Sequence, residues 1–235
     1  MRNTLNLLTI SIVFMGICTC VDAQNKAKTQ PATPKKEKEV KVKIVTDKGT
    51  MTVKLYNETP QHRDNFIKLA TEGFYDGTLF HRVIKGFMIQ GGDPDSKTAA
   101  PGQLLGNGGP GYDIPSEFNP KYYHKKGVLA AAREGDAVNP DKKSSGSQFY
   151  IVQGKTYTDD QLDMMANQLH LQFTPQQRNM YRTIGGAPWL DMNSTVFGEV
   201  IEGMSVIDKI ASVPTDPNNR PTEDVKIISI QVMEE

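Results

Sequence analysis

The chain has almost no cysteine, and this scarcity limits the chemistry it can perform. Its 235 residues include only two cysteines, Cys18 and Cys20, both near the N-terminus. If the leader segment discussed below is removed, no thiol remains, which excludes disulfide bonds, cysteine redox chemistry and thiolate metal ligands. The four histidines lie far apart in the sequence, which argues against a histidine-based metal site. We therefore expect neither a metal nor a cofactor.

An excess of charge of either sign is also absent. Lysine and arginine together number 27, as do aspartate and glutamate, so no general attraction to nucleic acid is expected. One basic stretch stands out, because seven lysines and only two glutamates lie between Lys26 and Lys43. Residues 24–39 have little to bury, and no aromatic residue is interleaved with these lysines. A flexible linker is therefore favoured over a membrane-surface or nucleic-acid contact.

Long apolar runs are missing except at the N-terminus. The run at residues 5–18 is about fourteen residues long, which is too short for a comfortable membrane span. Arg2 before it and small residues up to Ala23 after it are typical of a signal peptide, which we predict at residues 1–23. This predicts an exported protein, either periplasmic in a bacterium or secreted. An uncleaved anchor, or a lipid on one of the two cysteines, would tether the protein to a membrane instead.

Residues 40–235 form the predicted domain, and its local patterns favour short strands. Val42 and Ile44 alternate with lysines, and a second alternating run ends at Leu55, which predicts a hairpin with one buried face. Thr59 followed by Pro60 predicts the start of a helix, with Thr59 as its N-cap. We expect further strands at residues 80–84, 87–91, 127–133, 148–153, 195–201 and 225–233, and a second helix at residues 204–212.

Eight short strands with two helices indicate a mainly β fold. An antiparallel sheet exposes unpaired backbone groups at its edges unless it closes on itself. We therefore predict a closed eight-stranded antiparallel barrel, with the two helices capping its open ends.

The most informative stretch is FHRVIKGFMIQGGDP at residues 80–94. Two short strands about a turn would place alternate side chains on a common face, namely Phe80 and Arg82 before the turn and Met88 and Gln90 after it. Alone, an arginine in a strand is usually a surface charge. Together, a cation and an amide beside apolar side chains can hold an apolar ring and hydrogen-bond an amide carbonyl next to it.

This run resembles the signature of the cyclophilin family of peptidyl-prolyl cis-trans isomerases. The resemblance continues in GVLAAAR at residues 127–133, GSQFYIV at 146–152 and WLDMNSTVFGEVIEGMSVIDKI at 189–210, and it covers roughly residues 40–235. It implies the same eight-stranded barrel, no cofactor, and a monomer whose partners are proline-containing polypeptide clients. The implied activity is rotation about X-Pro bonds during the folding of exported proteins, through non-covalent stabilisation of the twisted amide.

The resemblance also implies an active site drawn from all four blocks. Its catalytic residues would be Arg82, Gln90 and Phe87, with Arg82 donating toward the proline nitrogen and carbonyl and Gln90 holding the guanidinium. Family matching puts Tyr150 where the pocket aromatic stands. The substrate-binding residues would be Met88, Gln148, Phe149, Tyr150, Ala132, Arg133, Trp189, Leu190 and Ser194.

The chain departs from the family pattern at two of these positions. Arg133 stands where many members have asparagine, and because the family's contact there runs largely through the backbone, we expect activity to survive. Ser194 stands where a histidine is common at the pocket rim, which puts that contact in doubt. Trp189 matches a position that favours cyclosporin in many relatives, so we expect a cyclosporin-type inhibitor to be a candidate ligand. A peptide-binding module or holdase, for which catalysis is incidental, is the alternative function.

Residues 155–187 are an insertion relative to the smallest family members. Two capping boxes, Thr158–Gln161 and Thr174–Gln177, are each followed by apolar residues at helical spacing, which predicts a helical hairpin. Its position between a strand and Trp189 places its base near the expected pocket. A wall or lid that selects substrates, a packing module and a docking element for a partner protein are three interpretations that stay open.

Phosphate binding and catalysis by a serine nucleophile find little support in the sequence. GNGGPG at residues 106–111 lacks the following Lys-Ser/Thr of a phosphate-binding loop, so a permissive backbone loop is expected. Ser144, Ser145 and Ser147 have no histidine nearby in the sequence, although proximity in space stays open. His81 is expected to be structural and to point away from Arg82. The other histidines, expected on surface elements, are His62, His124 and His170.

Overall fold

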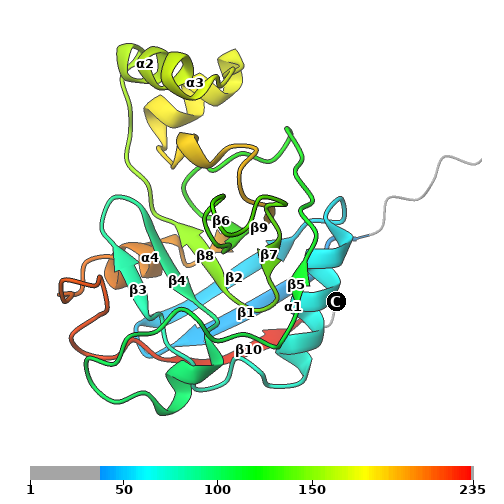
Figure 1. Cartoon of the computed structure of the whole chain (residues 1–235), viewed down its shortest axis with the longest axis vertical. Coiled ribbons are helices and arrows are strands. Elements are labelled where there is room, and N and C mark those ends of the chain that lie inside the picture. The colour runs from blue at the N-terminus through cyan, green and yellow to red at the C-terminus, as the bar shows by residue number, and fades with distance from the viewer. Residues whose placement is uncertain (1–37, 234–235) are drawn as a thin grey trace, which may run out of the picture. The chain divides into compact units, whose positions relative to one another are not determined.

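Figure 1 shows the strands and helices of the chain, from a computed structural model that describes residues 38–233. The predicted signal peptide at residues 1–23 lies outside the described residues, as does the predicted linker at 24–39 except for its last two residues. None of the helices in residues 38–233 is long and apolar enough to span a lipid bilayer.

The main sheet starts with the predicted hairpin, formed by β1 (Lys41–Thr46) and β2 (Gly49–Leu55). The two strands pair antiparallel in continuous register over the whole of β1. Val42 and Ile44 are fully buried, whereas the lysines that alternate with them stay partly exposed. The period of two in the sequence thus corresponds to one buried and one open face, as expected for a half-buried strand.

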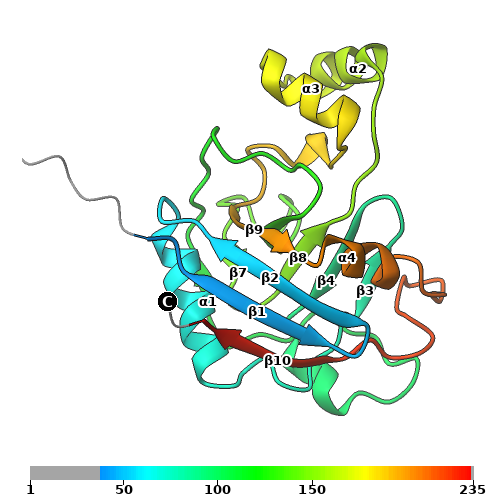
Figure 2. The same ribbon diagram turned by 180° about the vertical axis from the view of Figure 1, so that it is seen from behind.

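Eight antiparallel strands make up the main sheet, and they correspond one to one to the eight predicted strands. Their order across the sheet is β10-β1-β2-β9-β6-β8-β4-β3, and the sheet is strongly curled, as Figure 2 shows from behind. Two-residue strands β5 (Asp113–Ile114) and β7 (Ser144–Ser145) form a separate small sheet that is too short to have a sequence signature. The remaining bounds are β3 (Arg82–Ile84), β4 (Met88–Gly91), β6 (Val128–Ala131), β8 (Phe149–Val152), β9 (Val196–Glu202) and β10 (Ile227–Val232).

Closure of the sheet into a barrel is not confirmed. The strand ladder ends at β3 on one side and at β10 on the other, so it forms a curled half-barrel. An irregular segment before β3 crosses between these edges: the Phe80 N–H donates to the Val225 carbonyl at 2.9 Å, and the Ile227 N–H donates to the Thr78 carbonyl at 2.8 Å. Because only residues 77–80 lie along β10 before the chain turns into β3, the contact is too short to make a regular strand pair.

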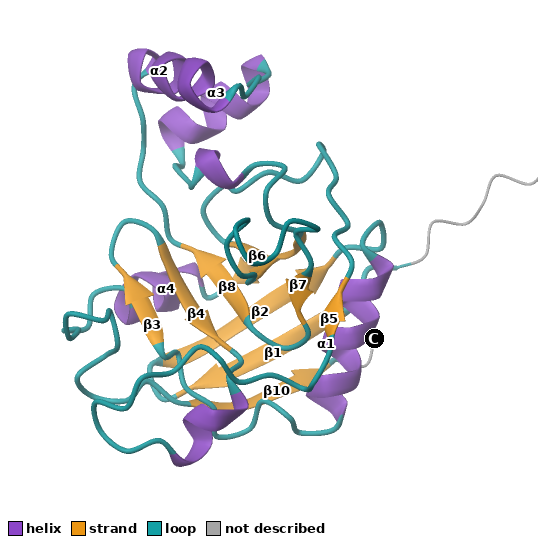
Figure 3. Ribbon diagram, viewed as in Figure 1, coloured by secondary structure: helices purple, strands orange, loops and turns teal. Residues whose placement is uncertain are grey.

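The two helices predicted outside the insertion are present and pack on the inner face of the sheet, although the closed barrel whose ends they were expected to cap is not formed. α1 (Pro60–Thr71) buries Phe66 and Leu69, and α4 (Met204–Ile210) buries Ile207 and Ile210. In Figure 3, α1 lies at the right of the curled sheet and α4 at its left. These four side chains belong to one apolar core with the inner face of the sheet. Burial of each such side chain contributes about 1.5–3 kcal/mol, so this core is the main source of stability.

The prediction that the Thr59 side chain caps α1 is wrong. The Thr59 hydroxyl donates to the Tyr56 carbonyl at 3.3 Å and makes no cap hydrogen bond. The free N–H groups of Gln61 and His62 instead donate to the carboxylate of Glu117, at 3.1 and 3.0 Å. A carboxylate also interacts favourably with the positive end of the helix dipole. The cap therefore comes from a residue far away in the sequence, which local pattern cannot reveal.

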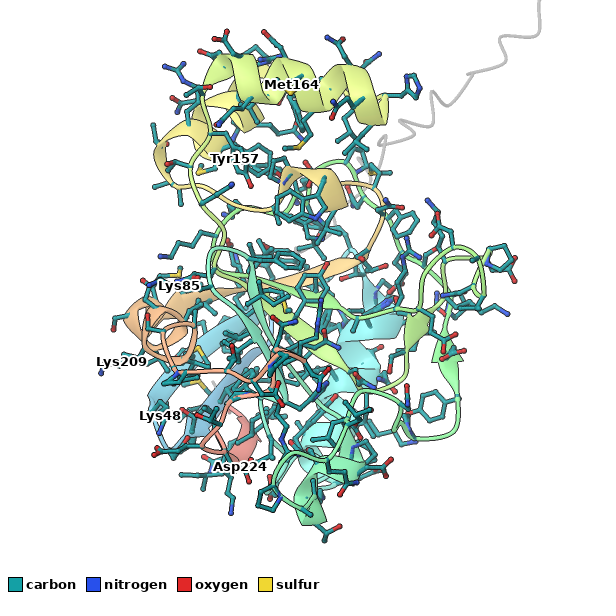
Figure 4. The ribbon with its side chains drawn as sticks, turned by 60° about the vertical axis from the view of Figure 1, so that its left-hand side comes forward. Lys48, Lys85, Tyr157, Met164, Lys209 and Asp224 are labelled. Atoms are coloured by element: carbon teal, nitrogen blue, oxygen red, sulfur yellow. The ribbon has the colours of Figure 1, made fainter. Side chains whose placement is uncertain are left out.

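The predicted helical hairpin consists of α2 (Asp159–Leu169) and α3 (Pro175–Thr183). Both predicted capping boxes are formed, because Thr158 and Thr174 each cap the helix that follows them. Figure 4 shows Met164 on α2 and Tyr157 nearer the base of the hairpin. Tyr157, Leu162 and Tyr181 are buried together in a small apolar cluster of their own. Two short 3-10 helices complete the fold, η1 (Pro94–Thr98) and η2 (Pro188–Leu190).

Candidate active site

A row of polar and aromatic side chains crosses three neighbouring strands. Arg82 on β3 lies directly opposite Gln90 on β4, and Gln90 lies directly opposite Tyr150 on β8. Residues that oppose each other in neighbouring strands project from the same face of a sheet. Arg82 Nη1 donates to Gln90 Oε1 at 3.1 Å, and Gln90 Nε2 donates to Gln148 Oε1 at 3.1 Å. Gln90 therefore orients the guanidinium, and Gln148 in turn orients Gln90.

Gln148 anchors this row to the glycine-rich loop at residues 106–111. The buried Gln148 amide nitrogen donates to the carbonyl oxygens of Gly106 and Gly108, at 2.8 Å each. The loop that resembled a phosphate cradle thus presents carbonyl oxygens to a neighbouring side chain. Its function in the structure is to fix Gln148, and through it Gln90.

The electrostatics of Arg82 favour an external ligand. The side chain is half-buried, and no carboxylate of residues 38–233 forms an ion pair with it. Burial lowers the pKa of Arg82 below its ordinary value, but arginine stays charged at neutral pH. Among residues 38–233 its only side-chain partner is the neutral amide of Gln90, so this partly desolvated cation can still donate hydrogen bonds to a carbonyl group.

Apolar side chains gather beside this cation, and we call them the site cluster. Met88, Ala132 and Tyr150 are buried, and Phe87, Trp189 and Leu190 pack on them with part of their surface open to solvent. The rings of Phe87 and Trp189 have centroids 5.2 Å apart. The sequence blocks around residues 80–94, 127–133, 146–152 and 189–210 thus meet at one place.

Phe149 does not belong to the site cluster. It follows the alternation of β8, so its ring lies on the face opposite that of Tyr150, inside the barrel core. There it makes edge contacts with Phe66, Tyr75 and Phe80, at centroid distances of 5.4, 5.6 and 6.2 Å. The expectation that Phe149 binds substrate is corrected: period two allows only one of two adjacent residues to face the site.

Phe80 corrects a second expectation. It was predicted to share a face with Arg82, but it is fully buried in the barrel core. The reason is that β3 begins only at Arg82, so the preceding residues do not follow its alternation. His81 is buried next to Arg82.

Arg133 and Ser194 form the far rim of the site. Arg133 Nε donates to the Asn193 carbonyl at 2.5 Å, and Arg133 Nη1 forms an ion pair with Asp136 at 2.7 Å. The guanidinium therefore holds the loop that carries Ser194. Ser194 itself is buried and small. A cavity of about 730 Å³ extends from here, lined by Gln90, Gln148, Ala132, Arg133 and the glycine-rich loop.

The sequence of residues 41–232 matches the family described as cyclophilin type peptidyl-prolyl cis-trans isomerase/CLD. The chain belongs to this family. A Staphylococcus aureus protein (strain NCTC 8325) named peptidyl-prolyl cis-trans isomerase is 39% identical over 198 residues, which are 83% of this chain and 93% of the relative. A Staphylococcus haemolyticus protein of the same name is 38% identical, with coverage of 83% and 92%.

Solved structures agree with this assignment. The crystal structure of a Cryptosporidium parvum cyclophilin type peptidyl-prolyl cis-trans isomerase superposes with a TM-score of 0.63 at 25% identity, covering 84% of this chain and 99% of that one. The same protein in the presence of the dipeptide Ala-Pro gives a TM-score of 0.62, with coverage of 83% and 99%. The chain is therefore an enzyme, a cyclophilin-type isomerase.

Two histidines expected on the surface are buried in this cyclophilin. His62 is 2% exposed, and its Nε2 lies 2.9 Å from Ser144 Oγ while its Nδ1 lies 2.7 Å from Glu117 Oε2. This resembles the order of a serine hydrolase triad. However, Ser144 is buried too, and the cavity next to His62 measures about 10 Å³, which has no room for a substrate. The trio instead ties α1 to β7.

His124 is the second histidine whose location the sequence did not indicate. It is fully buried between Tyr150 and Asp191, and neither partner is near it in the sequence. No local signal marks such a pairing, because each residue alone resembles ordinary structure. In residues 38–233, no group of three histidine, cysteine, aspartate or glutamate side chains is placed to hold a metal ion.

Proposed function

We propose that this isomerase accelerates rotation about X-Pro bonds of exported polypeptides during their folding, by binding the twisted amide without covalent chemistry. The observation that carries the proposal is the half-buried Arg82 guanidinium beside the site cluster, oriented by Gln90. A proline ring fits against Phe87, Met88 and Leu190, which leaves its nitrogen and the adjacent carbonyl facing the cation.

The energetics favour such a mechanism. Rotation about a peptide bond has a barrier of roughly 18–20 kcal/mol because of amide resonance, so a catalyst has only to stabilise the twisted state, in which resonance is lost. One hydrogen bond to a charged group contributes about 1.5–3 kcal/mol, and about 1.4 kcal/mol changes a rate tenfold. Arg82 can thus supply one or two powers of ten. The rest must come from a preorganised, water-poor pocket in which that bond is stronger.

The partners follow from the same site. The solved Cryptosporidium parvum relative in the presence of Ala-Pro supports a proline-containing peptide as the substrate class. The cavity beside Ala132 and Arg133 can take the residues that flank the proline. Trp189 at the rim, next to Phe87, supports binding of a cyclosporin-type inhibitor.

Export and monomeric action are part of the proposal. The composition of residues 1–23 supports a cleaved signal peptide, and hence a location in the periplasm or outside the cell. Sequencing the N-terminus of the mature protein after cell fractionation tests this. A protein that keeps Met1 and stays in the cytoplasm would contradict it.

Arg82→Ala separates catalysis from binding. We expect kcat/KM for an Ala-Pro test peptide to fall at least about tenfold, because one charge-assisted hydrogen bond to the twisted amide is lost. Peptide affinity should fall much less, since the site cluster is unchanged. The measurement is a protease-coupled or NMR exchange assay with a parallel binding titration. A variant that isomerises as fast as the wild type would show that the proposed role of Arg82 is wrong. The alternative, a peptide-binding module that the 730 Å³ cavity also suits, would be favoured by a wild-type protein that binds the peptide without accelerating its isomerisation.

A further inference from the structure

A buried chain of hydrogen bonds joins the inserted hairpin to the proposed pocket. Tyr181 on α3 donates to both carboxylate oxygens of Asp191, at 2.8 and 2.7 Å. Asp191 Oδ1 accepts from the His124 backbone N–H at 2.8 Å and lies 3.1 Å from His124 Nδ1. His124 Nε2 in turn lies 2.9 Å from the Tyr150 hydroxyl. Four separate segments of the chain thus meet in one polar network.

All four members of this network are buried. Tyr181 and His124 have no exposed surface, and Tyr150 and Asp191 are 5% and 8% exposed. Because a carboxylate only accepts, the His124 Nδ1 proton faces Asp191, and Nε2 is left to accept from the Tyr150 hydroxyl. Each polar group is therefore satisfied by another member of the network, as buried polar groups require. Removal of one member leaves its neighbours unpaired in a buried site.

Asp191 connects the network to two walls of the pocket. It directly follows Leu190, at the end of η2, so its carboxylate holds the turn that carries Trp189 and Leu190. Through His124 it also holds the hydroxyl of Tyr150, whose ring lies in the row beside Gln90. The base of the hairpin is close-packed here, since a Cβ at Gly186 would collide with the carbonyl oxygen of His124.

We propose that Tyr181 is a positioning residue for the isomerase site. Acting through Asp191 and His124, it fixes the Tyr150 ring and the turn that carries Trp189 and Leu190. The inserted hairpin is thus a structural part of the pocket wall, and this inference rests on the proposed function of that pocket. A hairpin that served only for packing would need the volume of the Tyr181 ring but not its hydroxyl group.

Tyr181→Phe separates these two cases. Phenylalanine keeps the ring, which packs between Tyr123 and Phe173 at centroid distances of 5.7 Å, and removes only the donor. We expect KM for an Ala-Pro peptide to rise about three- to tenfold with kcat nearly unchanged, because the apolar grip loosens while Arg82 is untouched. The emission of Trp189, the only tryptophan in the chain, should shift as its turn relaxes.

A matched control and a double-mutant cycle complete the experiment, all in the full chain. Tyr123→Phe makes the same chemical change in the same cluster, where the Tyr123 hydroxyl has no hydrogen-bond partner among residues 38–233, so KM and emission should stay at wild-type values. In a Tyr150→Phe background, Tyr181→Phe should raise KM less than it does alone, because one branch of the network is already broken.

The Tyr181 variant tests the positioning role, and the Arg82 variant tests the proposed pocket. Wild-type KM and emission in Tyr181→Phe, with only the urea midpoint lowered, would overturn the positioning role. Wild-type activity in Arg82→Ala would instead refute the proposed pocket, whatever Tyr181 does. If Tyr181→Phe does not fold, Tyr150→Phe interrupts the network at its other end without touching the hairpin, and a wild-type KM there would overturn the inference.

Discussion

Gln90→Leu tests whether the Arg82 guanidinium acts as a fixed donor or as a free charge. Gln90 is the only side-chain acceptor of Arg82 among residues 38–233, at 3.1 Å, and Gln148 holds it from the other side. Leucine has nearly the same size as glutamine, so the substitution removes the acceptor and keeps most of the packing. The guanidinium then keeps its charge but loses the group that orients it.

The magnitude follows from the geometry around Arg82. A hydrogen bond to a charged group contributes about 1.5–3 kcal/mol, and the lower end applies because Arg82 is partly exposed to water. About 1.4 kcal/mol corresponds to a factor of ten, so kcat/KM for an Ala-Pro peptide should fall about tenfold. The free energy of unfolding should change by less than about 1 kcal/mol, because water can hydrate the groups that are freed.

NMR exchange on an Ala-Pro peptide, with urea unfolding in parallel, measures both quantities. Gln153→Leu is the matched control: Gln153 accepts from the Gly86 N–H at 2.6 Å and donates to Asp208 at 3.0 Å, so it holds the turn after β3 without contacting Arg82. Its kcat/KM should stay within about twofold of wild type. A folded Gln90→Leu enzyme with wild-type kcat/KM would refute the idea that orientation of the guanidinium matters.

Two further predictions concern stability. Phe149→Ala should lower the free energy of unfolding by about 3–5 kcal/mol, because it empties the aromatic core; in the urea and peptide assays, a normal fold with lost activity would contradict its assignment to that core. Stability should also fall as the pH is lowered from about 7 to 5, because burial lowers the pKa of His62 and of His81 from 6.5. A histidine whose pKa is lower in the folded state binds fewer protons there, so its contribution is complete above pH 6.5 and is lost as the pH falls below it. Urea titrations at several pH values measure this slope; His81→Gln should flatten it, and an unchanged slope would count against His81.

Local patterns in the sequence were reliable wherever the partners are close together in the chain. The first hairpin follows from the alternation of Val42 and Ile44 with lysines, and β1 and β2 lie where that alternation places them. Both capping boxes of the insertion are formed as predicted, because each joins residues three positions apart. The resemblance to cyclophilins is confirmed by the match over residues 41–232.

Most predictions that were wrong concern residues whose contact partner is far away in the chain. Thr59 was expected to cap α1, but Glu117 does so from more than fifty residues away. Phe80 was assigned to the face of Arg82 because alternation was extended beyond the true start of β3. His62 and His124 were expected on the surface, whereas both are buried with acidic partners. A closed barrel was expected, and the regular ladder stops between β3 and β10.

The amino-acid sequence alone determined the family, the strands and helices, and which blocks carry the candidate site, because these depend on periodicity and on short motifs. The resemblance already indicated Tyr150 as the pocket aromatic, and only the tertiary structure placed Phe149 in the core instead of the site cluster. The tertiary structure alone brought Tyr181, Asp191 and His124 together behind the Tyr150 ring. The physical reason is that a hydrogen bond depends on distance in space, and residues distant in the sequence become neighbours only when the sheet curls and the hairpin packs on it.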